Sequence, residues 1–225
     1  METSLHRGLK DHYGLGRGGR CEVAVAGYRI DAVDEGGTLI EVQSGPLGAL
    51  KSKLRKLLPD HRVCVVKPVV VRRKLVRCDR VDGPERSIRQ SPKRGSLVDV
   101  FDDLVGVASF LPDKNLSVEL LGVSIEEVRV TRRRRPGYRV VDRRLDCILE
   151  TLRLNEPDDL WELLPAGLPD SEPFTTRDLA RKLARPLPFA QRVAYCLRLS
   201  GAVRPIGKVG NSHLYKAETS LIHSL

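Results

Sequence analysis

The chain has 225 residues, 41% of them hydrophobic, with 39 Lys and Arg against 29 Asp and Glu and a formal net charge of +10. This length is sufficient for one large domain with a smaller one appended, and the charge fits either a polyanionic partner or a basic protein that binds none. Aromatic residues make up only 4%, which argues against a surface that grips single strands mainly by base stacking.

The five cysteines are scattered and include no Cys-x-x-Cys pair. This pattern argues against a disulfide framework and against a zinc site, and it favours a reducing compartment. We find no signal-peptide pattern and no apolar run long enough to span a bilayer. We therefore expect a cytoplasmic protein without a membrane partner.

Apolar residues recur every four positions between residues 2 and 13, which predicts a first helix. A glycine-rich loop follows over residues 14–20 and carries Arg17 and Arg20. Such a loop is typical either of a flexible connector or of a segment that grips phosphates. It lacks the lysine and hydroxyl of a nucleotide-binding P-loop.

Residues 28–43 have the pattern of a β-hairpin with an Asp-Glu-Gly-Gly turn, in which glycine supplies the positive φ that the turn requires. The two strands bring Asp31 and Glu41 close together. Carboxylates on facing strands repel each other unless a cation lies between them. The hairpin therefore predicts a divalent-metal site, the alternative being two solvent-facing polar residues on an edge of the sheet.

After the second strand of the hairpin, residues 47–71 are predicted to form a helix and a buried strand. Residues 47–58 carry an apolar stripe with a basic opposite face, and residues 63–66 and 69–71 form near-continuous apolar runs. A buried strand after a crossover helix is typical of a βαβ unit with a partly parallel sheet.

A basic turn with Lys93 and Arg94 precedes a predicted helix over residues 96–107 and a predicted strand over residues 116–121. The run of four arginines in residues 131–137 ends in Pro-Gly, which is typical of a solvated linker or of a segment that lies against phosphates. We predict a core domain over residues 1–127, a basic linker over residues 128–140 and a second domain over residues 141–225.

The second domain is predicted to contain helices at residues 141–154, 176–184 and 188–200, followed by two short strands in residues 201–216. Helix, turn, helix and β-hairpin in this order are typical of a winged helix-turn-helix, whose second helix enters the major groove. The alternative is a module that binds protein or only dimerises. The candidate contacts on this module are Gln191, Arg192, Arg198, Lys208 and His213, with Arg181, Lys182 and Arg185 as further phosphate partners.

The order of a helix bearing Glu2, then Asp31, then Glu41-Val42-Gln43, a helix and a buried strand resembles the PD-(D/E)xK nuclease superfamily. That superfamily includes Holliday-junction resolvases and many restriction enzymes. The resemblance covers residues 1–75 and implies an α/β fold: a restriction-endonuclease-like αβββαβ core with a mixed sheet, followed here by the mainly α winged-helix domain.

The resemblance implies that Asp31, Glu41 and the backbone carbonyl of Val42 ligate Mg²⁺ or Mn²⁺, with Glu2 completing the site through a water. Magnesium prefers oxygen ligands and keeps several waters, which agrees with such a set. The usual lysine of the family is Gln43 here, whose amide orients a water but carries no charge. The lysines that would replace it in space are Lys51, Lys53 and Lys67.

The leading hypothesis is a metal-dependent DNA endonuclease that hydrolyses phosphodiester bonds while the winged helix binds duplex DNA. Cutting both strands commonly needs two sites related by symmetry, so a homodimer is consistent with it. The second hypothesis, favoured by Gln43, is a catalytically inactive DNA-binding protein of the same fold; the third is a protein-assembly factor. RNA is an alternative nucleic acid. The predicted catalytic residues are Glu2, Asp31, Glu41 and Gln43, and the predicted DNA-binding residues are Arg17, Arg20, Lys51, Lys93, Arg94, Gln191, Arg192, Arg198 and Lys208.

Overall fold

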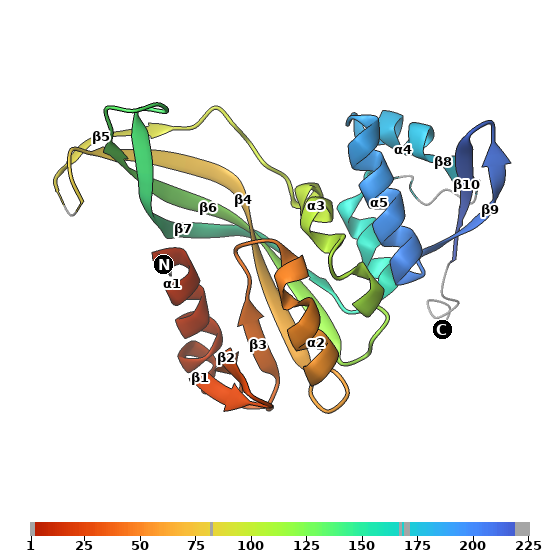
Figure 1. Cartoon of the computed structure of the whole chain (residues 1–225), viewed down its shortest axis with the longest axis horizontal. Coiled ribbons are helices and arrows are strands. Elements are labelled where there is room, and N and C mark those ends of the chain that lie inside the picture. The colour runs from red at the N-terminus through yellow and green to blue at the C-terminus, as the bar shows by residue number, and fades with distance from the viewer. Residues whose placement is uncertain (1–2, 82, 167, 169–171, 219–225) are drawn as a thin grey trace. The chain divides into compact units, whose positions relative to one another are not determined.

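The computed structural model describes residues 3–81, 83–166, 168 and 172–218 and shows a mixed α/β protein with a large mixed sheet (Figure 1). The chain divides into two compact units, each built from three separate segments. Unit 1 comprises described residues within Met1–Ser44, Cys64–Leu97 and Glu119–Leu152, and unit 2 those within Gly45–Val63, Val98–Val118 and Arg153–Leu225. These boundaries differ from those predicted at residues 127 and 141.

In the described residues, the strand order of the large sheet is β1-β2-β3-β4-β6-β7, with β5 paired to β4. The N-terminal elements of unit 1 are α1 (Ser4–Tyr13), η1 (Leu15–Arg17), β1 (Arg20–Val25), β2 (Tyr28–Val33) and β3 (Leu39–Val42). The short strand β5 (Glu85–Gln90) and three long strands follow: β4 (Val63–Cys78), β6 (Leu116–Thr131) and β7 (Tyr138–Leu154).

Helix α1 packs on the part of the sheet formed by β2 and β3. Its apolar stripe of Leu5, Leu9 and Tyr13 is buried in one core with Ile40 and Val42. This is the four-residue period that predicted the helix, so the first helix and the hairpin that follows it are confirmed in the described residues.

The predicted linker at residues 128–140 is instead the turn of a β-hairpin. Strand β6 continues to Thr131, the Arg132 nitrogen donates to the Gly137 carbonyl at 2.9 Å, and β7 then begins at Tyr138. Val128 and Val130 of this hairpin are buried, so the arginine run belongs to a folded ribbon. The linker prediction was wrong because the charge run and its Pro-Gly breaker indicate a turn, but they do not reveal that strands continue on both sides of it.

Two predicted helices differ from the structure, and one strand was not predicted. Residues 141–154 were predicted as a helix and form strand β7. Strand β5 was not predicted, and all six of its residues are exposed, which leaves no apolar period in the sequence to reveal it. The predicted helix over residues 96–107 is confined to two short turns, η3 (Leu97–Val100) and α3 (Phe101–Leu104).

The remaining elements, which complete unit 2, are η2 (Leu47–Leu50), α2 (Lys51–Leu57), η4 (Ala108–Phe110), η5 (Pro157–Leu163), β8 (Phe174–Thr175), α4 (Thr176–Leu183), α5 (Leu187–Ser200), β9 (Val203–Val209) and β10 (Ser212–Ala217). Helix α5 is central: it packs against α3, η4, α4 and β9. Its Val193 and Leu197 are fully buried, as are Phe101 and Leu104 on the neighbouring α3. The two predicted helices and the terminal hairpin of this unit are confirmed.

The small sheet of unit 2 has the order β8-β10-β9, with both pairs antiparallel. A helical segment, a short strand, two helices and a β-hairpin thus follow one another between residues 157 and 217. In the described part of the chain, no helix is long and apolar enough to cross a membrane.

Candidate functional site

The turn of the β2–β3 hairpin fixes the register of the two strands. The Asp34 carboxylate accepts from the Thr38 nitrogen at 2.8 Å, and Gly37 adopts a φ of 77°, which glycine tolerates without strain. Ala32 then pairs with Ile40 and Val33 with Leu39. Continuing this register by one residue sets Asp31 against Glu41.

Asp31 is held by donors from two elements. Its Oδ2 accepts from the backbone nitrogen of Val42 at 2.9 Å, and its Oδ1 lies 3.4 Å from His6 Nε2 on α1. The Asp31 and His6 side chains are each 23% exposed, so both reach solvent. The carboxylate is therefore oriented by the fold while one side of it stays open.

A third carboxylate lies in the same row of the sheet. Cys21 pairs with Ala32 and Val23 with Ile30, so the register places Glu22 of β1 against Asp31. Glu22 has a φ of 57°, in the left-handed region, and its side chain contacts Lys10 and Arg29. Glu22 was not predicted from the sequence, because the residue type gives no signal of that backbone conformation.

A cavity of about 570 Å³ opens beside Asp31. The hydrogen bond from Lys10, first, and that from Arg29, second, lower the pKa of Glu22, so this carboxylate stays ionised. The cavity thus combines anionic oxygens with cationic side chains from α1 and β2. Its lining residues are Thr3, His6, Lys10, Glu22, Arg29, Asp31 and Ser44.

The other predicted catalytic residues lie near the end of β3. Glu41 is only 5% exposed and is not part of the lining of that cavity in the described residues. Gln43 continues the sheet, its backbone nitrogen donating to the Val66 carbonyl at 2.9 Å. The buried Lys67 places its ammonium 3.5 Å from the Ser44 carbonyl oxygen. Glu2 lies outside the described residues.

The donor set fits magnesium only in part. Within the described ranges, no three His, Cys, Asp or Glu side chains gather as a group that could hold a metal ion. Asp31 and Glu41 nevertheless supply hard oxygen ligands on adjacent strands, and Mg²⁺ is often bound by one or two carboxylates with waters in its other positions. Such a pair of carboxylates would leave most positions around a bound Mg²⁺ to water molecules.

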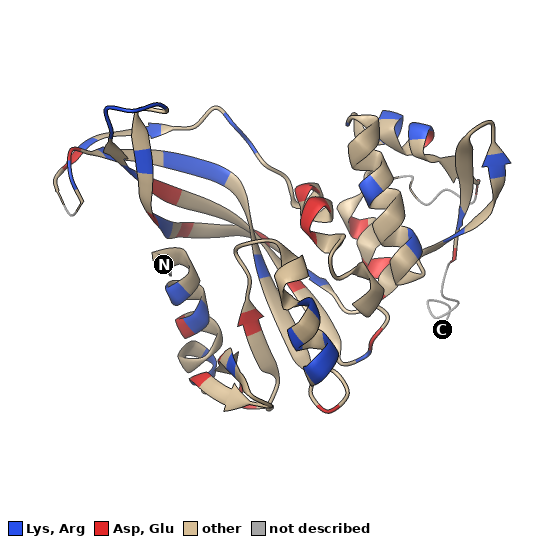
Figure 2. Ribbon diagram, viewed as in Figure 1, with Lys and Arg blue, Asp and Glu red and all other residues tan. Residues whose placement is uncertain are grey.

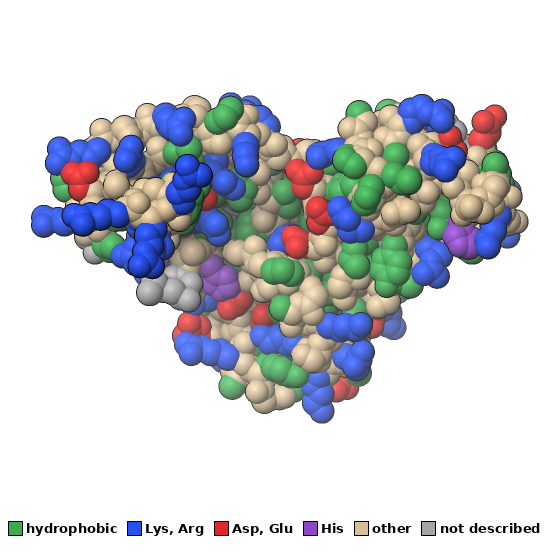
Figure 3. All heavy atoms as spheres, turned by 45° about the horizontal axis from the view of Figure 1, so that its top comes forward, with side chains coloured by type: hydrophobic (Ala, Val, Ile, Leu, Met, Phe, Trp, Pro, Cys, Tyr) green, Lys and Arg blue, Asp and Glu red, His purple; other side chains and the backbone are tan. Residues whose placement is uncertain are grey.

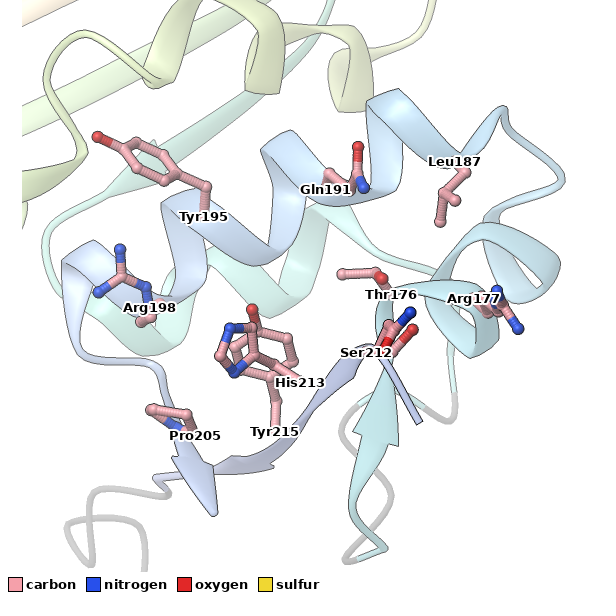
Figure 4. Close-up of a pocket in the computed structure, with 11 residues that line it drawn as sticks. Thr176, Arg177, Leu187, Gln191, Tyr195, Arg198, Pro205, Ser212, His213 and Tyr215 are labelled. Atoms are coloured by element: carbon pink, nitrogen blue, oxygen red, sulfur yellow. The ribbon is translucent and has the colours of Figure 1, made fainter. Parts of the chain in front are cut away.

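Unit 2 has a cavity of about 560 Å³ between α5, the start of α4 and the β9–β10 hairpin (Figure 4). Side chains of α5 lie on one side and those of β10 on the other. From α5 come Leu187, Gln191, Tyr195 and Arg198, spaced four, four and three residues apart and therefore on one helix face. The other lining residues are Thr176, Arg177, Pro205, Asn211, Ser212, His213 and Tyr215.

The start of α4, beside this cavity, is fixed by a reciprocal cap. Thr175 and Asp178 exchange hydrogen bonds between side chain and backbone, and the bond from the Thr175 hydroxyl is the main cause of a lowered pKa at Asp178. This cap sets the position from which Arg177 reaches the cavity.

The predicted contacts on α5 separate into two groups. Gln191 and Arg198 line the cavity, and Arg198 lies 5.7 Å from the ring centre of Tyr195. Arg192 instead forms an ion pair with Asp102 at 2.5 Å. Tyr195 was not among the predicted contacts, although its spacing from Gln191 and Arg198 places it on the same helix face.

The remaining predicted DNA-binding residues are distributed over both units. In unit 1, the Arg17 guanidinium already has two partners: it lies 4.2 Å from the ring centre of Tyr13 and 3.7 Å from the Glu119 carboxylate. Arg20 is exposed at the start of β1. Lys51 on α2, Lys93 after β5 and Lys208 on β9 are exposed as well.

Arg94, also exposed, donates from its guanidinium to the Ser91 carbonyl at 2.9 Å. Figure 2 shows that Lys and Arg recur along β4 and around the turn between β6 and β7. These basic positions lie in unit 1 and outside both cavities described above.

Comparison with known proteins shows a family but no solved relative. The family described as "Domain of unknown function (DUF8091)" matches residues 3–155, and the chain belongs to it. An uncharacterized protein of Treponema pallidum (strain Nichols) is 37% identical over 222 residues, which cover 96% of this chain and 86% of that protein. No solved structure matches the chain significantly.

Proposed function

We propose that this member of the DUF8091 family is a metal-dependent DNA endonuclease whose residues 174–217 hold duplex DNA as a winged helix. The observation that carries the proposal is the Asp31 carboxylate, fixed by the Val42 nitrogen beside Glu41 in a helix–hairpin–helix–strand arrangement. That element order and those carboxylates are what the PD-(D/E)xK resemblance requires. The net charge of +10 supports a polyanionic substrate.

Asp31, Glu41 and the Val42 carbonyl are the groups that would hold Mg²⁺ or Mn²⁺. When bound, such an ion lowers the pKa of a coordinated water and neutralises charge on the scissile phosphate. The Val42 nitrogen and His6 orient Asp31, and the amide of Gln43 orients a water by hydrogen bonding. Lys67 supplies, near Ser44, the positive charge that Gln43 lacks.

The cavity beside α5 supports the duplex-binding part of the proposal. A helix face with an amide, a guanidinium and a phenol at regular spacing can enter a major groove and contact base edges. His213, Ser212 and Asn211 of the hairpin border the same cavity and can contact the flanking backbone.

A nicking assay on supercoiled plasmid with Mg²⁺ or Mn²⁺ tests the proposal. Asp31→Asn and Glu41→Gln keep side-chain shape but remove the negative charge, so each should slow cutting by about 100-fold or more without weakening duplex binding. Asp11→Asn, an exposed acidic residue on α1, is the matched control and should cut like the parent. Parent-like cutting by the Asp31 and Glu41 variants would contradict the assignment.

A second candidate is a DNA-binding protein of the same fold without catalytic activity. Two features favour it: Gln43 stands in place of the usual lysine, and no group of three His, Cys, Asp or Glu side chains in the described residues is arranged to hold a metal ion. It predicts salt-sensitive duplex binding by the parent with no cutting under either metal, so the same assay separates the two.

A further inference from the structure

The positive charge of the chain is concentrated in two segments of unit 1. Residues 72–94 carry nine Lys and Arg and three Asp and Glu, and residues 129–144 carry eight and one. Together they have a formal charge of +13, so the rest of the chain is net negative. We call these two segments the basic arm.

The described residues of the basic arm form folded β-ribbons. They comprise the outer half of β4, all of β5, the end of β6 and the start of β7. Val76, Cys78, Val128 and Val130 form a small core of their own beneath them. The charges are therefore displayed on a defined surface, and Figure 3 shows Lys and Arg side chains crowded over this part of unit 1.

Among the residues that the structure describes, most cations of the arm have no anionic partner. Six of the seventeen form ion pairs with carboxylates, which leaves eleven without one in the part of the chain that the structure describes. All eleven are exposed, and such a density of like charge repels itself unless an anion approaches. The eleven are Arg72, Arg77, Arg80, Arg89, Lys93, Arg94, Arg132, Arg133, Arg134, Arg135 and Arg139.

Protection of an exposed edge explains only a small part of this charge. Edge strands such as β5 commonly carry a charge or a proline to prevent pairing with other chains. The arginines of the β6–β7 turn do not lie on that edge strand, and neither does Arg77 on β4. Their concentration points to a ligand.

A cleft of about 390 Å³ lies within the arm. Arg77 and Arg89 line it together with the Ser87 hydroxyl and Arg129. The Arg129 guanidinium is fixed in place, 3.9 Å from the ring centre of Tyr138 and 2.6 Å from the Glu127 carboxylate. Arginines that line one cleft together with a serine are well suited to phosphate oxygens, which accept several hydrogen bonds at once.

We propose that the basic arm binds the sugar-phosphate backbone of a nucleic-acid duplex, with the cleft between Arg77, Arg89 and Arg129 seating one phosphate. A two-stranded β-ribbon matches the width of the major groove of duplex DNA, and guanidinium groups on either side of it reach the phosphates. The proposal deepens the proposed function and rests on it for the choice of nucleic acid as the polyanion.

Fluorescence anisotropy of a labelled DNA duplex, titrated with the full chain at several salt concentrations, tests the proposal. The arm variant is Arg77→Gln/Arg89→Gln/Arg134→Gln, and the control is Arg55→Gln/Lys56→Gln/Lys114→Gln, which removes the same charge from exposed positions outside the arm. The arm variant should raise Kd at least tenfold and reduce the slope of log K against log salt by about 0.9 for each lost phosphate contact. The control should leave the slope nearly unchanged.

Equal losses in both variants, or parent-like binding by the arm variant, would overturn the proposal. A parallel titration uses vesicles that contain phosphatidylserine. If the parent bound these vesicles more tightly than the duplex, and the arm variant lost that binding, the ligand would be a membrane surface. This result would also overturn the proposal. Nicking is recorded in parallel. Should Asp31→Asn cut like the parent, the nuclease proposal fails, while the salt slope still decides the function of the arm.

Discussion

At the scale of single residues, a buried phenol–carboxylate pair joins α1 to the sheet. Tyr13 is 1% exposed and donates its hydroxyl to the Glu119 carboxylate, which Arg17 also approaches. Burial, followed by the hydrogen bond to Glu119, raises the pKa of Tyr13 above its usual range. The phenol therefore stays protonated and remains a donor to the carboxylate.

Tyr13→Phe should destabilise the protein by about 1 to 3 kcal/mol, because Glu119 loses a donor inside the core. Urea unfolding followed by circular dichroism measures this effect. Tyr195→Phe, which changes a half-exposed phenol, should shift stability by less than about 0.5 kcal/mol. Equal stabilities for Tyr13→Phe and the parent would show that the Tyr13 hydroxyl contributes nothing to folding.

Of the residues around the candidate site, some could be predicted from the sequence and others could not. Asp31 was predicted because strand alternation and the turn residues determine the hairpin register. Glu22 was missed because its left-handed backbone is imposed by the sheet and not by its own type. The neighbouring partner His6 was missed as well, since a contact between a helix and a strand has no local signature.

At the scale of elements, one error has a clear physical cause. Val141 packs on the small core of the arm and Leu145 on the main core of unit 1, four residues apart. A spacing of four fits one face of a helix and, being even, also one face of a strand. Residues 141–154 were therefore ambiguous, and only pairing with β6 decides between the two.

The separation of residues on α5 leads to a second prediction. Arg198→Ala should weaken duplex binding about tenfold or more, because the side chain borders the cavity. Arg192→Ala removes the same charge from the same helix, but its guanidinium is engaged by Asp102, so the loss should stay below about threefold. Anisotropy with a labelled duplex measures both. A larger loss for Arg192→Ala would place the contact surface on another face of α5.

At the scale of the whole molecule, chain order and spatial order differ. The predicted boundaries assumed that each domain is continuous in sequence, whereas each unit is assembled from three segments. In unit 1, β7 forms hydrogen bonds with β6 and completes that side of the sheet. In unit 2, α3, which carries Phe101, packs against α5. Composition and breakers indicate loops, but they do not reveal which distant segments share a core.

Separate expression of residues 1–127 and 141–225 tests this interleaving. The first fragment lacks β7, and the second lacks α3 and η4 and thus exposes the buried face of α5. Neither should show a cooperative thermal transition by circular dichroism, whereas the full chain should. Cooperative unfolding of either fragment would mean that its missing segments are dispensable for its core.

The three-segment construction also constrains how the protein is made. Chains commonly fold one domain at a time as they leave the ribosome, beginning at the amino terminus. Here unit 1 is incomplete until Leu152 has emerged from the ribosome. By then, two of the three segments of unit 2 are already outside the exit tunnel. The nascent polypeptide must therefore hold the buried segment Val63–Val69 of β4 beside β3 alone until β6 has emerged, and such an unpaired strand edge is prone to aggregate or to bind a chaperone.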